Sequence, residues 1–202
     1  MKTGFTALGL WVSLISRISA NKDIITLNTN GEAWIQEATA TLVLPQLPDE
    51  VTGDIALWSA IMMNDFSGDF LQGVTQSSPA SVGYCNINDE WCNFAYTLKG
   101  SNPTVGKAVV AKPGSKVQTH CRGQHGTTFY ISIECASGTC DDAPAHSWED
   151  VSVVLNQADQ SFGHSGDWQF GAQGGAMSTS DGGKTWSFSR LSVPRTPIAH
   201  EE

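Results

Sequence analysis

The stretch FYISIEC, residues 129–135, decides the fold, because apolar and polar residues alternate along it without a break. In an extended strand this alternation places Phe129, Ile131 and Ile133 on one face. Glu134 then projects from the opposite face. A period of two sustained over the whole stretch predicts a β-strand that buries one of its faces in a core.

The same alternation recurs on both sides of this stretch. The other predicted strands are residues 22–27, 33–43, 55–63, 70–76, 91–98, 107–110, 116–120, 151–155, 168–170, 176–178 and 185–191. The Asn-Gly turn at residues 28–31 indicates that the first two of these strands form a strand-turn-strand unit. Short strands with Gly-rich turns and no sustained helical period predict an all-β fold, an antiparallel sandwich or barrel.

The N-terminal residues 1–20 have the pattern of a signal peptide. Lys2 precedes an apolar run, and the small residues Ser19 and Ala20 end it. Cleavage after Ala20 would leave residues 21–202 as a single β-sandwich domain. No later stretch approaches the roughly 18 consecutive apolar residues that a membrane-spanning helix needs. We therefore expect a secreted protein without a membrane partner.

The charge of the chain argues against nucleic acid as a partner. The formal net charge is −9 at pH 7, and removal of Lys2 and Arg17 with the signal peptide would make it −11, since −9 − 2 = −11. Such a surface repels phosphate backbones and anionic lipid headgroups.

The five cysteines follow the predicted cleavage site, at Cys85, Cys92, Cys121, Cys135 and Cys140. In an oxidising compartment the pairs Cys85–Cys92 and Cys135–Cys140 are the expected disulfides, because each closes a short loop. Cys121 is then either a buried free thiol or a sign that the local pairing is wrong. Neither pair combines zinc-ligand spacing with a matching His pair, so we expect no metal site.

The stretch LWSAIMMNDFSGDFLQGV, residues 57–74, sets a buried-looking run against one uncharged polar side chain, Gln72. Gly73 follows it, and glycine within a strand often marks a bulge or a close approach. If Gln72 and Glu134 face each other across a sheet, they could hold a water between them. Glu134 would act as general base and the Gln72 amide would stabilise an oxyanion. The competing interpretation is a glutamine bonded to a loop and a solvent-facing glutamate.

Both residues lie in motifs that resemble those of the fungal glutamic peptidases, or eqolisins. The similar segments are LQGV at residues 71–74, the region around Trp91, the Pro-Gly turn at residues 113–114 and ISIE at residues 131–134. The resemblance implies a secreted concanavalin-like or jelly-roll sandwich without a cofactor, in which Gln72 and Glu134 are the catalytic pair. The chain lacks one residue of the family's Leu-Gln-x-Gly-Val motif and the tryptophan of its Trp-Ile-Val-Glu motif.

The segment TSDGGKTW, residues 179–186, looks like a single Asp-box hairpin. Asp181 would accept hydrogen bonds from turn amides, the glycines would supply positive φ, and Trp186 would anchor the turn. One copy predicts a stable local hairpin without a catalytic role.

Two functional hypotheses follow, and the sequence leaves open whether the protein is an enzyme at all. In the first, a concave face lined by Gln72, Trp91 and Glu134 takes a small molecule or peptide. The protein would then be an acid-type hydrolase, or a cofactor-free cyclase or isomerase of a fungal secondary-metabolite pathway. In the alternative, a noncatalytic extracellular module binds glycans or cell wall through Trp148 and Trp168.

Overall fold

The computed structural model describes residues 20–49, 51–63, 69–79, 83–85, 89–100, 102–140 and 142–198. The predicted signal peptide lies outside these ranges except for Ala20, so its cleavage stays a prediction. Within the described ranges, no helix is long and apolar enough to cross a membrane.

The described residues form antiparallel strands and a short 3-10 turn, η2 (Phe162–His164). The strands are β1 (Ala20–Asn28), β2 (Ile35–Val43), β3 (Asp54–Met63), β4 (Phe70–Ser77), β5 (Trp91–Lys99), β6 (Asn102–Val105), β7 (Val109–Ala111), β8 (Lys116–Ser137), β9 (His146–Leu155), β10 (Asp167–Trp168), β11 (Gln173–Gly174) and β12 (Thr185–Val193). The predicted all-β antiparallel class is confirmed.

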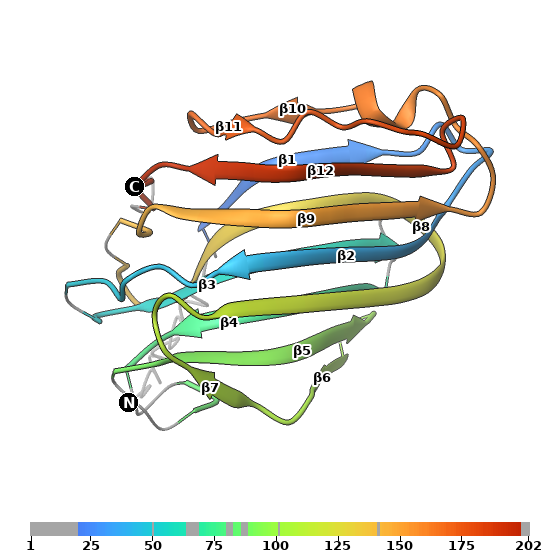
Figure 1. Ribbon diagram of the computed structural model, residues 1–202. Coiled ribbons are helices and arrows are strands. Elements are labelled where there is room, and N and C mark those ends of the chain that lie inside the picture. The colour runs from blue at the N-terminus through green and yellow to red at the C-terminus, as the bar shows by residue number, and fades with distance from the viewer. Residues whose placement is uncertain are drawn as a thin grey trace, which may run out of the picture.

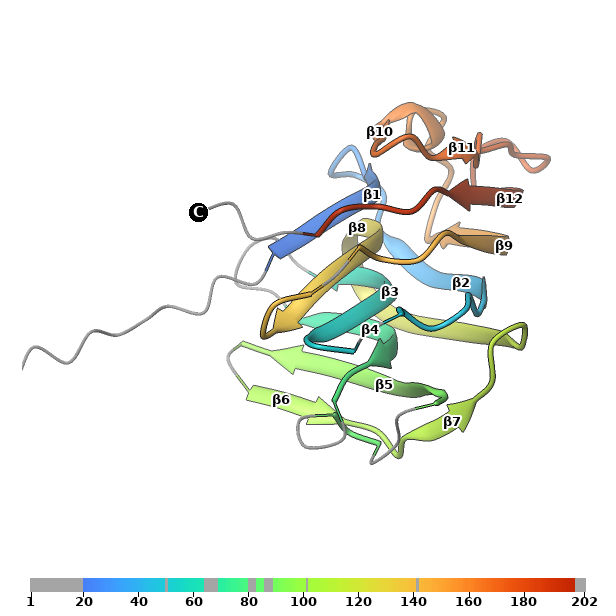
Figure 2. The ribbon, with the colours of Figure 1, turned by 90° about the vertical axis from the view of Figure 1, so that its left-hand side faces the viewer.

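The strands make two layers joined by β8, which passes from one layer to the other (Figure 2). The first half of β8 pairs with β2, and β9, β12 and β11 continue that second layer (Figure 1). The second half pairs with β1 on one side and β3 on the other, and β4 and β5 continue the first layer. The ladder is continuous, yet the molecule is a sandwich because β8 belongs to both layers.

The sequence predicted two separate strands within β8. A bulge replaces the predicted break: His125 has a positive φ of 61°, and the register of the neighbouring ladders shifts at Gly126. A Cβ atom at Gly126 would lie 2.5 Å from Cγ2 of Ile61, so only glycine allows this close passage. The bulge bends β8 without ending it.

The strand-turn-strand prediction for the first two strands is wrong as a pairing. β1 pairs with β8 and β10, whereas β2 pairs with β8 and β9. The side chain of Asn30 accepts hydrogen bonds from the backbone of Glu32 and Ala33, at 3.0 and 3.4 Å. Such a turn around an asparagine lets the connection cross from one layer to the other.

The main core lies between the two layers. Phe129, Ile131 and Ile133 are buried there, on the face of β8 that the alternation predicted. A second buried cluster covers the opposite face of the first layer and includes Trp58 and Phe94. Strand β3 is therefore covered on both faces along most of its length, as its continuous apolar sequence predicted.

Both predicted disulfides are present, Cys85–Cys92 and Cys135–Cys140. Cys121 is a free thiol, and burial raises its pKa to about 11, so it stays protonated. Cys121 is thus free, as the first of the two open interpretations predicted, but it is only partly buried. Two disulfides are consistent with an extracellular location.

Candidate active site on the outer face of the first layer

A cavity of about 610 Å³ opens on the face of the first layer that points away from the second layer. Its walls come from alternate residues of β1, β3, β4, β5 and β8, together with Tyr84 from the segment before β5. Strand β3 runs through the middle and presents the small side chain of Ala56, which leaves a depression between larger neighbours.

Gln72 and Glu134 both line this cavity, so they share a face and a site. They are not side by side. Gln72 lies opposite Ala60, which in turn lies opposite Tyr130, whereas Glu134 lies opposite Ala56. The two residues are thus four positions out of register, which is about 13 Å along the strand direction. The predicted sharing of one water between them is not supported.

Trp58 occupies the row between the two residues. Its indole Nε1 donates to Oε2 of Glu134 at 3.1 Å, which orients that carboxyl. Its ring packs edge-on against Phe70 and Tyr130, with ring centroids 5.4 and 6.3 Å apart. Trp58 therefore separates the glutamate end of the cavity from the end that holds Gln72.

The glutamine in register with Glu134 is Gln76, because both lie opposite Ala56. Gln76 Nε2 donates to Oδ2 of Asp54 at 2.7 Å, and Gln76 Oε1 accepts from the backbone N–H of Tyr84 at 3.3 Å. These two bonds fix which end of the amide faces the carboxyl.

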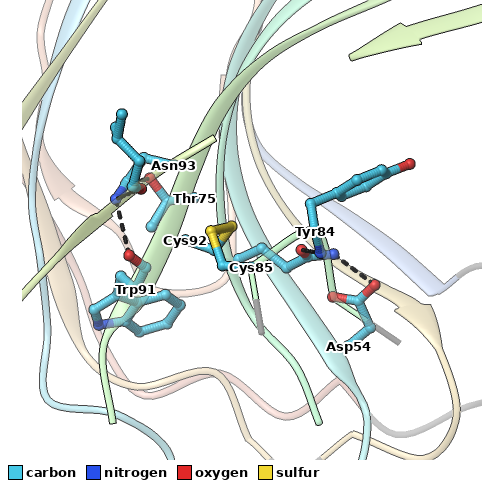
Figure 3. Close-up of a disulfide and its surroundings, with 9 residues drawn as sticks. Asp54, Thr75, Tyr84, Cys85, Trp91, Cys92 and Asn93 are labelled. Atoms are coloured by element: carbon cyan, nitrogen blue, oxygen red, sulfur yellow. Dashed lines mark hydrogen bonds between the residues drawn. A yellow bond between two sulfur atoms is a disulfide. The ribbon is translucent and has the colours of Figure 1, made fainter. Parts of the chain in front are cut away.

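The disulfide between Cys85 and Cys92 lies beside this network, next to Tyr84 and Asp54 (Figure 3). Cys92 is opposite Gln76 in the β4–β5 ladder. The bridge thus ties the segment that carries Tyr84 to the strand beside Gln76.

Asp54 is the most unusual group in the cavity. The residue is 7% exposed, and its Oδ1 atom has no hydrogen-bond partner among the described residues. Burial raises its pKa to about 6, the Gln76 hydrogen bond opposes that rise, and the charge of Glu134 adds to it. Asp54 is therefore able to hold or release a proton at mildly acidic pH, which is typical of acid–base residues in active sites.

Two of the three predicted ligand-binding tryptophans lie in the core. Trp91 is fully buried, and its Nε1 donates to the carbonyl oxygen of Pro45 at 2.9 Å. It is one residue out of phase with the cavity-lining positions of β5, so alternation turns it inward. Trp148 is 1% exposed and also packs in the core. Trp168, on β10, is half-buried and does not line this cavity. The predictions for Trp91 and Trp148 are therefore wrong.

Asp54 and Gln76 are the site residues that the sequence analysis missed. Gln76 could have been found by extending the alternation of residues 70–76, because it lies on the same strand face as Gln72. Asp54 gave no such signal, since an aspartate after Gly53 reads as part of a loop. Gly73 does mark a close approach: a Cβ atom there would lie 2.0 Å from Cγ2 of Thr119.

The Asp-box segment forms the predicted local turn. Oδ1 of Asp181 accepts from the Thr179 hydroxyl at 3.0 Å and from the Thr185 backbone N–H at 2.8 Å. The Thr185 bonds lead the effects that lower the pKa of Asp181 to about 2. Trp186 is buried, and its Nε1 donates to the carbonyl oxygen of Gly183. These hydrogen bonds hold the segment as a structural turn.

Comparison with known proteins finds similarity only among solved structures. No protein-family model matches the sequence, and no curated protein matches it. The structure is similar to that of SCP-B, a member of the eqolisin family of peptidases, in a complex with the tripeptide Ala-Ile-His. The identity is 16%, the alignment covers 85% of this chain and 98% of that one, and the TM-score is 0.42.

A second similar structure is scytalido-glutamic peptidase with a transition state analog inhibitor. Here the identity is 15%, the coverage is again 85% and 98%, and the TM-score is 0.41.

Proposed function

We propose that this chain is a cofactor-independent hydrolase that uses Asp54 and Glu134 as an acid–base pair in the outer-face cavity. The observation that carries the proposal is the state of Asp54. This carboxyl is buried, Gln76 donates to one oxygen, and the other oxygen has no partner in the part of the chain that the structure describes; burial raises its pKa to about 6. Holding a carboxyl in this way costs stability, so a role in chemistry is its simplest explanation.

The two carboxyls have separate roles. Glu134, oriented by Trp58, takes a proton from a water while the water oxygen bonds to the electrophilic carbon of the substrate. Protonated Asp54 gives its proton to the leaving group as the bond to that carbon breaks. One water is consumed. Glu134 then loses its extra proton to solvent and Asp54 regains one, which restores the starting state.

The two glutamines support this chemistry in different ways. Gln76 positions Asp54, because its amide is fixed at both ends. Gln72, four positions out of register with Glu134, is proposed to bind a more distant part of an extended substrate. The catalytic role that the sequence assigned to Gln72 thus becomes a binding role.

The wider biological setting is also a proposal. Removal of residues 1–20 and secretion fit the two disulfides, and a fungal origin rests on the sequence motifs alone. The same acid–base pair would serve a cyclase or isomerase, but hydrolysis needs only water as a second reactant. The noncatalytic glycan-binding alternative relied on Trp148 as a contact residue, but Trp148 lies in the core and is not available to a glycan.

The test is hydrolysis of a denatured protein and of amide, ester and glycoside model substrates between about pH 3 and pH 8. Wild-type turnover should fall as pH rises through about 6, because Asp54 must be protonated. Asp54→Asn and Glu134→Gln should each reduce kcat roughly 10²- to 10⁴-fold, with the protein still folded by calorimetry.

Glu32→Gln is the matched control, because it removes one exposed carboxylate outside the cavity. It should leave turnover unchanged. Inertness of the wild-type protein on all of these substrates, or activity retained by both cavity variants, would exclude the proposal.

A further inference from the structure

The cavity carries negative charge on several walls. Asp23 enters from β1, Asp54 from β3 and Glu134 from β8. Asp23 accepts from the Ser132 hydroxyl at 2.7 Å and from the Asn21 amide at 3.0 Å. No Lys, Arg or His is among the residues that line the described cavity. The lining thus favours a ligand that brings positive charge.

The same walls are rich in aromatic rings. Trp58, Phe70 and Tyr130 form a triangle with ring centroids 5.4, 6.2 and 6.3 Å apart. Tyr84 and Phe94 make a second pair at 4.7 Å. Aromatic faces attract organic cations and pack against their hydrocarbon parts. Carboxyls beside aromatic rings suit an organic cation better than an inorganic one.

A bare metal ion is the alternative occupant. Among the described residues, no group of three or more His, Cys, Asp or Glu side chains is placed to hold one. The three carboxyls therefore line the same cavity without converging on one point.

Asp54 gives an independent indication of a ligand. Its side chain is more than nine-tenths buried, and its Oδ1 atom lacks any partner within the described protein. A buried carboxylate oxygen without a donor is costly, and an N–H of a bound ammonium group would remove that cost. Asp54 is one of the residues that line the cavity, together with Asp23 and Glu134.

We infer that the cavity binds organic ammonium cations, with Asp54 as the counter-ion and the aromatic rings against the hydrocarbon part of the ligand. The inference deepens the proposed function and rests on it only in sharing this cavity and Asp54. In that reaction an amine leaving group, released neutral after it takes the Asp54 proton and then protonated by solvent, would be one such ligand.

The two roles of Asp54 require opposite protonation states. An ammonium ligand needs the carboxylate, which dominates above about pH 6, whereas catalysis needs the acid, which dominates below it. The other titratable groups of the cavity wall are Asp23, Glu134 and three tyrosines, Tyr84, Tyr96 and Tyr130. Burial raises the pKa of Tyr96 and Tyr130, so these two stay neutral.

The experiment is isothermal titration calorimetry with 2-phenylethylammonium and its neutral analogue 2-phenylethanol. At about pH 7.5 the ammonium should bind at least tenfold more tightly than the alcohol, and this preference should shrink several-fold at about pH 4.5. At pH 6, titrations in two buffers of different ionisation enthalpy should show proton release on ammonium binding. Nonspecific adsorption would not produce that release.

Asp54→Asn should abolish both the preference and the proton release, and Glu32→Gln should change neither. Asp23→Asn, a second variant that leaves the Asp54 network intact, should weaken ammonium binding without removing the proton release. Equal affinity for the two probes, or a preference that survives Asp54→Asn in a folded protein, would overturn the inference. If the protein binds the ammonium probe but shows no turnover, only the proposed function is excluded. If it shows turnover but no preference for the ammonium probe, only the present inference is excluded.

Discussion

Two aspartates in this molecule show opposite treatment by their surroundings. Asp181, in the turn of residues 179–186, gathers donors on one oxygen, and its pKa is lowered to about 2. Asp54, in the outer-face cavity, accepts from Gln76 on one oxygen, its other oxygen has no partner within the described ranges, and its pKa is raised to about 6. The ionised Asp181 carboxylate stabilises the fold, whereas ionisation of the Asp54 carboxyl in its buried position destabilises it.

The difference teaches where to look for function. The exposed Asp181 carboxylate accepts hydrogen bonds from its own turn, and these bonds explain its presence. A buried carboxyl oxygen that has no partner among the described residues requires another explanation, and a bound ligand is the one proposed for Asp54. On this criterion the turn is structural and the cavity is the proposed functional site.

The largest expected effect on stability is in the turn. Trp186→Ala should destabilise the protein by about 3–5 kcal/mol, because it removes a buried aromatic ring and leaves the carbonyl oxygens of Asp159 and Gly183 without their indole donor. Tyr84→Ala in the cavity wall is the comparison, since Tyr84 is 54% exposed. Chemical unfolding should show a far smaller loss for Tyr84→Ala. Equal losses would contradict the distinction between the two regions.

A smaller change in stability is expected for Asp54→Asn, and this substitution should stabilise the protein. The folded state raises the pKa of Asp54 from its ordinary value of 3.8 to about 6, so wild-type stability is full below pH 3.8 and is lost as pH rises through 6. Asparagine carries no charge at any of these pH values. The variant should therefore gain on the order of 2 kcal/mol relative to wild type between pH 4 and pH 7.

Urea unfolding at several pH values measures this difference. A stability difference that stays constant from pH 4 to pH 7 would show that the fold does not penalise the Asp54 carboxylate.

Asp181→Asn should cause the smallest change in stability, and unlike Asp54→Asn it should destabilise the protein. The fold lowers the pKa of Asp181 from 3.8 to about 2, so its contribution is present above pH 3.8 and is lost as pH falls through 2. The variant should have a lower melting temperature than wild type at pH 7, and this difference in melting temperature should become smaller as the pH is lowered. Because Asp181 is exposed, added salt should also reduce this difference. A difference in melting temperature that becomes larger in acid would contradict the stabilising role proposed for the Asp181 carboxylate.

The sequence predicted well whatever depends on local alternation. Phe129, Ile131 and Ile133 point into the core because a period of two fixes which side chains share a face. Both disulfides followed from short loops. The outer face of β8, with Glu134, followed in the same way.

What failed depends on pairings between distant segments. Gln72 and Glu134 were placed on one face correctly, but their register is set by β3, whose pairing the sequence did not reveal. Gln76, the true register partner of Glu134, was within reach of the same reasoning. Trp91 was predicted to line the cavity, but it is one residue out of phase with the cavity-lining positions of β5 and points into the core. The short strand β6 was missed because Pro103 argues against a strand, yet β6 pairs only with β5 among the described strands.

The central claim is that the fold holds Asp54 as a partly protonated carboxyl, and one titration tests it directly. The side-chain carboxyl ¹³C resonance of Asp54, assigned by comparison with Asp54→Asn, can be followed by NMR from pH 3 to pH 8. The account predicts a midpoint near 6 that moves lower when 2-phenylethylammonium is bound. A midpoint near the ordinary 3.8, unchanged by the ammonium ligand, would contradict it.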